Sequence, residues 1–272
     1  MYQFPQQSSC LKLSDKETLN KLIMKFGLIG YPIAHSLSPS IFKAGYNGKY
    51  PYELIEEQDF EAAYQRFLKD YDGINVTAPF KETALKKADI ISEECRIVGA
   101  TNLLVKTPAG VAAYNSDYRG LVMLLKEISD RQSTVLIVGF GGAGKAAAAA
   151  ADASGHKTVI LNRTRYSQDI LPLDAFREEF RKADIIIYNL PVGIPQMEEL
   201  TEEDFCPGRA KVLLEANYRN PSFDNCIIDR AKRANPLFSQ IEGKKWLLYQ
   251  AVAGYELFTG EKPDLDRMSD VL

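Results

Sequence analysis

An apolar run that breaks into glycines constrains the fold of this chain more than any other feature. Residues 134–138 are apolar and rich in β-branched side chains, which is typical of a buried parallel strand. Residues 139–144 then read G-F-G-G-A-G and contain the pattern G-x-G-x-x-G. The alanine run at 146–151 predicts a helix with Gly155 as a cap beyond its end, and residues 158–161 predict a second strand. This order of strand, turn, helix and strand is the context in which the motif binds a dinucleotide.

The chemistry of that turn suits a phosphate. Glycines allow a tight turn and a close approach of the backbone to a pyrophosphate, and the helix N-terminus offers N–H groups and the positive end of its dipole. Glycine turns also serve packing alone, so the motif by itself is a weak signal. The flanking strands and helix favour nucleotide binding.

Strands and helices alternate along most of the chain. We expect strands at 25–29, 52–55, 73–76, 102–106, 111–114, 134–138, 158–161, 185–189 and 212–216. We expect further helices at 39–46, 59–69, 80–87, 118–128, 174–182 and 223–234, and a last helix at 246–258 that closes the chain. Such alternation predicts the α/β class with parallel sheets. Because about a hundred residues precede the glycine unit, we expect a second domain, with a substrate cleft between the two.

Composition excludes several classes of function. The net charge of −3 gives no basic footprint for nucleic acid, and no apolar run reaches membrane-spanning length. The N-terminus lacks the apolar core of a signal peptide. Four scattered cysteines without a C-x-x-C pair and only two histidines indicate reduced thiols in a cytoplasmic protein and no metal site. We expect a small-molecule substrate and no nucleic-acid or membrane partner.

Residues 1–23 differ in composition from the rest of the chain. They begin with a polar, Gln- and Ser-rich stretch, and Met24 stands directly before the first expected strand. An ordinary N-terminal helix with a capping box at residues 14–17 is one interpretation. The other, which we adopt, is that residues 1–23 form an N-terminal extension and the core fold begins at Met24.

Polar residues follow several of the expected strands, where α/β proteins place their ligands. Ser36 and Ser38 stand just before a helix, and their hydroxyls suit a carboxylate, although Ser38 alone is also typical of a helix cap. We interpret the neighbouring His35 as structural. Lys81 taken alone is typical of a solvated surface charge, and Asp117 of a helix N-cap.

Taken together and in order, from about Met24 to the end, these stretches resemble the shikimate dehydrogenase family. That family shows S-x-S-P, N-V-T-x-P-x-K, G-A-x-N-T, N-T-D-x-x-G, G-x-G-G-x-x-x-A, N-R-T and a closing Q-A. Each tag is short, but their joint occurrence in sequence order is specific. This chain supplies Ser36-Leu37-Ser38-Pro39, Asn75-Val76-Thr77-Ala78-Pro79-Phe80-Lys81, Asn102, Asn115-Ser116-Asp117, Asn162-Arg163-Thr164 and Gln250-Ala251.

The resemblance implies a two-domain oxidoreductase that acts on a CH–OH group. It would reduce 3-dehydroshikimate to shikimate with NADPH, reversibly, in chorismate and aromatic amino-acid biosynthesis. The substrate-binding, catalytic domain would comprise residues 24–117 plus 244–272, because the last helix would return to it. Residues 118–243 would form a doubly wound, Rossmann-type NADP-binding domain. We expect a monomer or a homodimer.

The resemblance also assigns roles to residues. Lys81 and Asp117 would be the catalytic pair, and Ser36 and Ser38 would hold the substrate carboxylate, with Tyr218 assisting. The ring hydroxyls would be bound by Thr77, Lys81, Asn102, Asp117 and Gln250. The cofactor would be bound by Gly139, Phe140, Gly141, Gly142, Ala143, Gly144, Asn162, Arg163 and Thr164.

The residues after the second strand of the glycine unit bear on the choice of cofactor. A unit that prefers NAD carries a carboxylate about 20 residues beyond the glycines, where it binds the ribose hydroxyls. Here the strand ends in Asn162-Arg163-Thr164, and Asp152 lies in the intervening helix. Arg163 offers a planar set of donors that matches a 2′-phosphate, although it is also typical of a plain surface arginine. We therefore expect NADP(H).

Three alternatives stand beside this interpretation. An NAD-preferring quinate/shikimate dehydrogenase would need the acidic residue that is missing here. A methylene-tetrahydrofolate dehydrogenase would not explain Ser36, Ser38 and Asp117 together, and a non-catalytic sensor of nucleotide and small acid would not require Lys81 and Asp117. The chain departs from the family pattern at Leu103, Ser116, 188–190 and 244–246, and the last two departures concern the nicotinamide contacts.

Overall fold

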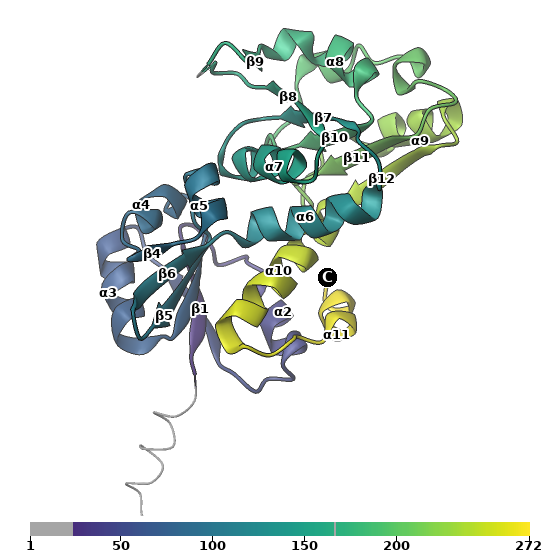
Figure 1. Cartoon of the computed structure of the whole chain (residues 1–272). Coiled ribbons are helices and arrows are strands. Elements are labelled where there is room, and N and C mark those ends of the chain that lie inside the picture. The colour runs from purple at the N-terminus through teal and green to yellow at the C-terminus, as the bar shows by residue number, and fades with distance from the viewer. Residues whose placement is uncertain (1–23, 166) are drawn as a thin grey trace, which may run out of the picture.

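The computed structural model describes residues 24–165 and 167–272, which form two six-stranded sheets with helices on both faces of each (Figure 1). The α/β prediction is therefore confirmed. The expected N-terminal extension, residues 1–23, lies outside the described residues. None of the described helices combines the length and the apolarity needed to cross a membrane.

The first sheet is mixed, with strand order β2-β1-β3-β5-β6-β4. Its strands are β1 (Phe26–Gly30), β2 (Tyr52–Glu56), β3 (Gly73–Val76), β4 (Ile90–Ile91), β5 (Leu103–Thr107) and β6 (Gly110–Tyr114). β1 runs parallel to β2 and β3, whereas β5 is antiparallel to both β3 and β6. The expectation of parallel sheets is wrong here, because only residues 108–109 separate β5 from β6 and a parallel crossover needs a dozen or more.

Helices cover both faces of this sheet. The helices that surround it are α2 (Ser38–Gly45), α3 (Phe60–Asp70), α4 (Lys81–Leu85), α5 (Glu93–Val98), α10 (Gly243–Thr259) and α11 (Leu265–Asp270). α3 and α4 pack on one face around Phe67 and Ile74, and α2, α10 and α11 pack on the other around Phe26 and Phe42. Phe26 stacks on Phe258 of α10 with ring centroids 4.9 Å apart, so the far end of α10 is anchored to this sheet.

α10 contributes to both halves of the molecule. Trp246, near its start, packs with Val135 and Ile137 of the second sheet, whereas Phe258, near its end, packs with Phe26 of the first. The assignment of residues 244–272 to one domain therefore stays a prediction. The expectation that this helix closes the chain is wrong, because α11 follows it and packs on α2 through Met268.

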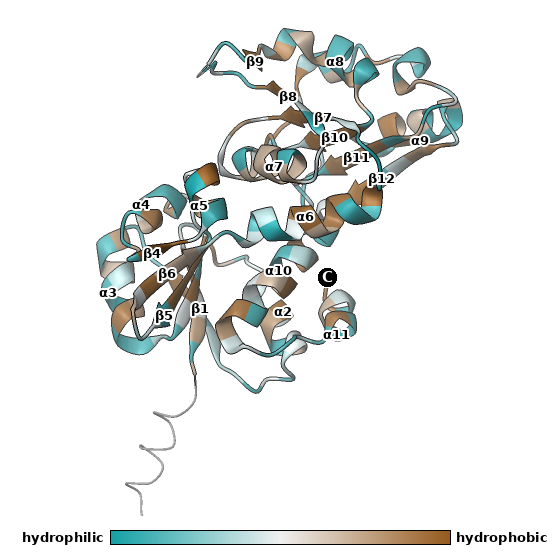
Figure 2. Cartoon of the chain, in the orientation of Figure 1, coloured by the Kyte–Doolittle hydropathy of each residue, from teal (hydrophilic) through white to brown (hydrophobic). Residues whose placement is uncertain are grey.

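The second sheet is parallel throughout, with strand order β12-β11-β10-β7-β8-β9. Its strands are β7 (Thr134–Val138), β8 (Lys157–Leu161), β9 (Ile170–Leu171), β10 (Ile185–Tyr188), β11 (Lys211–Glu215) and β12 (Phe238–Glu242). The helices around it are α6 (Ser116–Ile128), α7 (Gly142–Ala153), α8 (Phe176–Lys182) and α9 (Asn225–Ala234), with 3₁₀ turns at Leu173–Ala175, Pro195–Met197 and Glu202–Phe205. Buried side chains of its central strands alternate between the α8–α9 face and the α6–α7 face, and these strands are apolar along their length (Figure 2).

Two features of this topology position the site. The strand order of the second sheet reverses between β7 and β10, and α/β proteins bind ligands outside the carboxyl ends of their strands at such a point. α6 and α10 also lie side by side, because Gly120 has no side chain where a Cβ would come within 2.5 Å of the Gln250 nitrogen. This close approach brings Gln250 next to the start of α6.

Candidate active site

A cavity of about 620 Å³ lies between the carboxyl ends of the two sheets. It is lined by loops that follow β1, β3 and β11 and by the first turns of α6, α7 and α10. All eight residues that we expected at the substrate line it, namely Ser36, Ser38, Thr77, Lys81, Asn102, Asp117, Tyr218 and Gln250. Ala143 of the glycine turn lines it too, so the substrate cavity and the expected cofactor site are continuous.

Lys81 and Asp117 form an ion pair inside this cavity. The distance from Lys81 Nζ to Asp117 Oδ2 is 2.6 Å, and the two side chains are 23% and 17% exposed. Asp117 is not the cap of α6, because the Asn115 side chain accepts the capping hydrogen bond from the Tyr118 N–H at 3.0 Å. The Asp117 carboxylate is therefore left to the lysine, and Trp246 Nε1 fixes the Asp117 backbone by donating to its carbonyl at 3.1 Å.

Ser116 connects two of the expected substrate residues. Its hydroxyl accepts from Asn102 Nδ2 and donates to Gln250 Oε1, both at 3.0 Å, and its N–H donates to Asn102 Oδ1 at 2.7 Å. Ser116 is fully buried, so this network orients Asn102 and Gln250 from behind the cavity wall. The sequence singled out Ser116 only as a conservative replacement, since nothing in it showed that residues 102 and 250 meet.

The two serines lie together at the start of α2. The Ser36 hydroxyl donates to the Ser38 hydroxyl at 3.1 Å and accepts from the Ser38 N–H at 3.2 Å. Leu37 occupies the N-cap position and Ser38 is the first residue of α2, so the alternative of Ser38 as a cap is wrong. Tyr255 donates to the Ser38 carbonyl at 3.3 Å and holds this turn against α10.

The loop after β11 supplies the opposite side of the cavity through residues 216–219. Burial raises the pKa of Tyr218, so its hydroxyl stays a neutral donor at physiological pH. Arg219 lines the cavity beside it, a position that no motif in the sequence pointed to. His35 lines the cavity as well, and its carbonyl accepts a hydrogen bond from Arg219 Nη2.

The glycine turn is shaped for a phosphate. A Cβ at Gly144 would lie 1.9 Å from the Gly139 carbonyl oxygen, so only glycine allows the first turn of α7 to pack on the strand. A Cβ at Gly141 would meet no atom within 4 Å, and no side chain caps the N-terminus of α7. The open space and the uncapped N–H groups fit the pyrophosphate of a dinucleotide.

The residues after β8 fit the adenosine end of NADP. Asn162 is buried, accepts from the Phe140 N–H at 3.0 Å and donates to the Thr164 carbonyl at 2.8 Å, so it ties the glycine turn to the next loop. Arg163 and Thr164 are exposed on that loop. Asp152 is occupied elsewhere, since it accepts a hydrogen bond from the Thr158 hydroxyl at 2.7 Å. No described carboxylate thus occupies the tip of β8.

The departure from the family pattern at 188–190 has a structural role. Leu190 lies so close to the glycine turn that a Cβ on Gly139 would come within 2.8 Å of it. Asn189 Nδ2 donates to the Ile187 carbonyl at 3.2 Å. Residues 188–190 therefore support the turn from the neighbouring strand.

Two family profiles match successive parts of the chain. The sequence profile described as "Shikimate dehydrogenase substrate binding domain" matches residues 28–104. The profile described as "D-isomer specific 2-hydroxyacid dehydrogenase, NAD binding domain" matches residues 114–205. The two matches agree with a substrate-binding part and a nucleotide-binding part.

Similar proteins span nearly the whole chain. The shikimate dehydrogenase (NADP(+)) of Haloarcula marismortui is 33% identical over 267 residues, which cover 90% of this chain and 96% of the relative. That of Methanothermobacter thermautotrophicus is 30% identical over 273 residues, with coverages of 90% and 94%.

Solved structures of similar proteins also match nearly the whole chain. Shikimate 5-dehydrogenase from Thermus thermophilus in complex with NADP(H) and shikimate is 26% identical with a TM-score of 0.75, over 92% of this chain and 98% of that one. A quinate dehydrogenase from Corynebacterium glutamicum in complex with NAD has a TM-score of 0.76 over the same shares at 21% identity, which shows the common fold alone.

Proposed function

The chain belongs to the shikimate dehydrogenase family, and we propose that it reduces 3-dehydroshikimate reversibly to shikimate with NADPH. The single observation that carries the proposal is the Lys81–Asp117 pair, which lies in a cavity continuous with the glycine turn. Ketone reduction requires a proton donor beside the hydride donor, and an ammonium oriented by a carboxylate can supply that proton. This reaction belongs to chorismate and aromatic amino-acid biosynthesis.

Substrate binding follows from the cavity walls. Ser36 and Ser38 present two hydroxyls at one point, and we assign them to the substrate carboxylate, with the neutral hydroxyl of Tyr218 assisting. Thr77 is assigned to the ring hydroxyls. Asn102 and Gln250 are assigned to them as well, because Ser116 already holds both amides in fixed orientations, which lowers the entropy lost on binding. The remaining ring contacts would come from the Lys81–Asp117 pair.

Proton transfer is assigned to Lys81. NADPH, when bound, supplies the hydride to the carbonyl carbon. The carbonyl oxygen then carries the negative charge, and the Lys81 ammonium donates a proton to it. Asp117, 2.6 Å from Lys81 Nζ, orients the ammonium and accepts a hydrogen bond from a neighbouring ring hydroxyl. In the reverse direction the neutral lysine takes the proton from the shikimate hydroxyl.

Cofactor contacts complete the proposal. The backbone N–H groups at 141–144 would hold the pyrophosphate. Arg163 would hold the 2′-phosphate, with Thr164 beside it and Asn162 fixing the loop. A cytoplasmic location and a monomeric or homodimeric state remain parts of the proposal, and the free thiols of Cys95, Cys206 and Cys226 support the former.

The test is turnover by the purified full-length protein. Shikimate and quinate are each offered with NADP⁺ and with NAD⁺, and the absorbance of the reduced cofactor is recorded. We expect the highest kcat/KM for shikimate with NADP⁺. A preference for quinate with NAD⁺ would assign the chain to the quinate branch, and no turnover with either acid would favour a sensor.

A further inference from the structure

Arg219 is an exposed arginine at the edge of the cavity and adds a positive charge to its lining. Among the described residues that line it, Lys81 and Arg219 are basic and Asp117 is acidic. Lys81 and Asp117 neutralise each other at 2.6 Å. Within residues 24–165 and 167–272 the structure records no ion pair for Arg219, so the cavity retains one positive charge from this side chain.

Arg219 lines the same cavity as the two serines and contacts the residue that precedes them. Its Nη2 donates to the carbonyl of His35, the residue that directly precedes Ser36, although Arg219 follows β11 and His35 follows β1. Its guanidinium lies 5.6 Å from the centroid of the Tyr218 ring. The guanidinium thus spans the cavity mouth from the second sheet to the serine turn of the first.

The loop that carries Arg219 is held in place by its own side chains. Asn217 Oδ1 accepts from the N–H groups of Arg219 at 3.3 Å and Asn220 at 3.2 Å, and Asn217 Nδ2 donates to the Pro191 carbonyl at 3.2 Å. The buried carboxylate of Glu215 accepts from the Ser222 and Phe223 N–H groups and closes the loop at its other end. The guanidinium is therefore presented on a braced loop.

Serine hydroxyls alone provide no charge to balance a carboxylate. A guanidinium has five N–H donors in one plane, and the structure records only one of them in use among the described residues, toward His35. Arginine binds carboxylates with two parallel hydrogen bonds, which are stronger than bonds between neutral groups. Its place beside Ser36 makes the carboxylate of a bound acid the natural partner.

We propose that Arg219 binds the substrate carboxylate together with Ser36 and Ser38, and that this contact joins the two sheets over the bound acid. The inference rests on the proposed function, because it names a further residue of the same substrate site. The carboxylate is remote from the reacting carbonyl, so the contact is made equally in the ground state and in the transition state. Its loss should therefore raise KM and leave kcat nearly unchanged.

The experiment compares an acid with an uncharged ester. The purified variants Arg219→Gln, Arg219→Lys and Arg233→Gln are assayed with shikimate and with methyl shikimate, each with saturating NADP⁺. Arg233 is an exposed arginine on α9, so its variant controls for the loss of one positive charge. Binding is followed separately through the fluorescence of Trp246, the single tryptophan of the chain, which lines the cavity.

For Arg219→Gln we expect KM and Kd for shikimate to rise about 10- to 100-fold, the size of a charged hydrogen bond, with little change for the ester. Arg219→Lys should recover part of the loss, and Arg233→Gln should match the wild type. Unchanged shikimate binding in Arg219→Gln would overturn the inference. Equal losses for acid and ester would overturn it too, since they would show only a structural contact with His35.

Failure of the proposed function is separate. It would appear as wild-type protein that does not turn over shikimate, independently of the results for the Arg219 variants. The fluorescence titration still decides in that case. The inference is supported if the wild type binds shikimate more tightly than the ester and Arg219→Gln loses this difference. A wild type that binds neither overturns both.

Discussion

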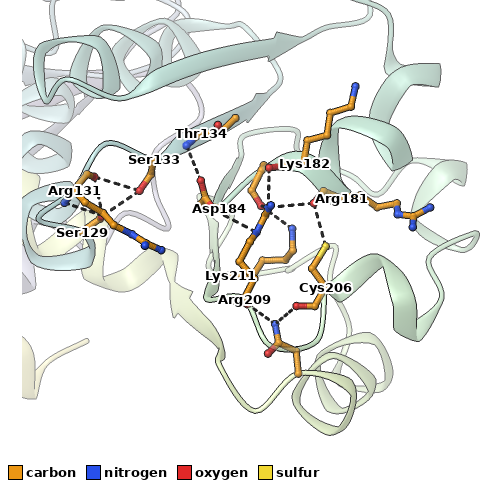
Figure 3. A network of polar contacts seen from close by, with 12 residues as sticks. Ser129, Arg131, Ser133, Thr134, Arg181, Lys182, Asp184, Cys206, Arg209 and Lys211 are labelled. Carbon is orange, nitrogen blue, oxygen red and sulfur yellow. Dashed lines mark hydrogen bonds and ion pairs between the residues drawn. The ribbon is translucent and has the colours of Figure 1, made fainter.

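A buried lysine should make the stability of this protein depend on pH in the alkaline range. Lys211, at the start of β11, is fully buried. Figure 3 shows its side chain within a network of polar contacts. Its Nζ donates to the carbonyls of Phe180 at 2.5 Å and Ala183 at 2.7 Å, at the C-terminal end of α8, and lies 4.8 Å from the centroid of the Phe180 ring. Burial lowers the pKa of Lys211 from 10.5 to about 8, while nearby Cys206 opposes this shift and Arg209 adds a smaller lowering.

The direction of this pH dependence follows from the pKa of Lys211, which is about 8 in the folded protein and 10.5 in the unfolded chain. Below pH 8 the lysine is protonated in both states, and folding buries the charge at full cost. Between pH 8 and 10.5 the folded protein releases the proton while the unfolded chain keeps it, so the free energy of unfolding rises with pH. At about 1.4 kcal/mol for each pKa unit, the interval corresponds to about 3 kcal/mol.

Urea unfolding at several pH values from 7 to 10.5 measures this, with Lys211→Met as the reference. The free energy of unfolding of the wild type minus that of the variant cancels the titration of all other groups and should rise by about 3 kcal/mol across the range. The exposed Lys232→Met should give a flat difference. A flat difference for Lys211→Met as well would refute the argument that this lysine is held in a desolvated site.

Three further predictions concern the site. Lys81→Ala should lower kcat by about 10²- to 10⁴-fold while the circular dichroism spectrum stays native. The control variant at the exposed Lys86, Lys86→Ala, should keep wild-type turnover. A normal kcat in Lys81→Ala would contradict the proton-donor role. Arg163→Ala should raise KM for NADP⁺ about 10- to 100-fold and change that for NAD⁺ little, and equal KM values for both cofactors in the wild type would contradict it. Gly144→Ala should lower the free energy of unfolding in urea by about 1–3 kcal/mol, because its Cβ would clash with the Gly139 carbonyl oxygen. Gly141→Ala should keep the wild-type stability and weaken NADP⁺ binding. Equal stabilities of the two variants would contradict these separate roles for the two glycines.

The regular elements with strong apolar periodicity were predictable from the sequence. The strand expected at 134–138 has the observed bounds of β7, and the helix expected at 59–69 is α3, shifted by one residue. α3 buries apolar side chains at helical spacing, and β7 is a short β-branched apolar run that ends at the glycine turn. The family resemblance that followed from the ordered motifs is confirmed by the relatives, and the expected NADP(H) agrees with the cofactor in their names.

Short and marginal elements escaped prediction for a physical reason. β4 and β9 have two residues each, too few to show any period, and exist because a neighbouring strand offers hydrogen bonds. β12 lies at the edge of its sheet, and its sequence FSQIE carries little apolar signal. These strands are determined by tertiary contacts, which local sequence does not contain.

The residues that connect the two halves of the site were hidden by sequence distance. Arg219 and His35 are 184 positions apart, and Ser116 and Gln250 are 134 apart. Neither Arg219 nor Ser116 was assigned a role from its own segment, and each gains one only when the sheets are placed together. The residues expected at the substrate line the cavity as a group, while their individual roles stay predictions.

The start of α6 shows how geometry decides what residue types leave open. Asn115 and Asp117 are both good N-cap residues, and the sequence offers no reason to prefer one. In the structure the neutral Asn115 caps the helix, which leaves the charged Asp117 in the first turn with its carboxylate toward Lys81. Had the aspartate capped the helix, its charge would have been satisfied by backbone N–H groups and Lys81 would have lacked the partner that orients it. The pairing on which the proposed proton transfer depends is thus set by which of two neighbouring residues takes the cap.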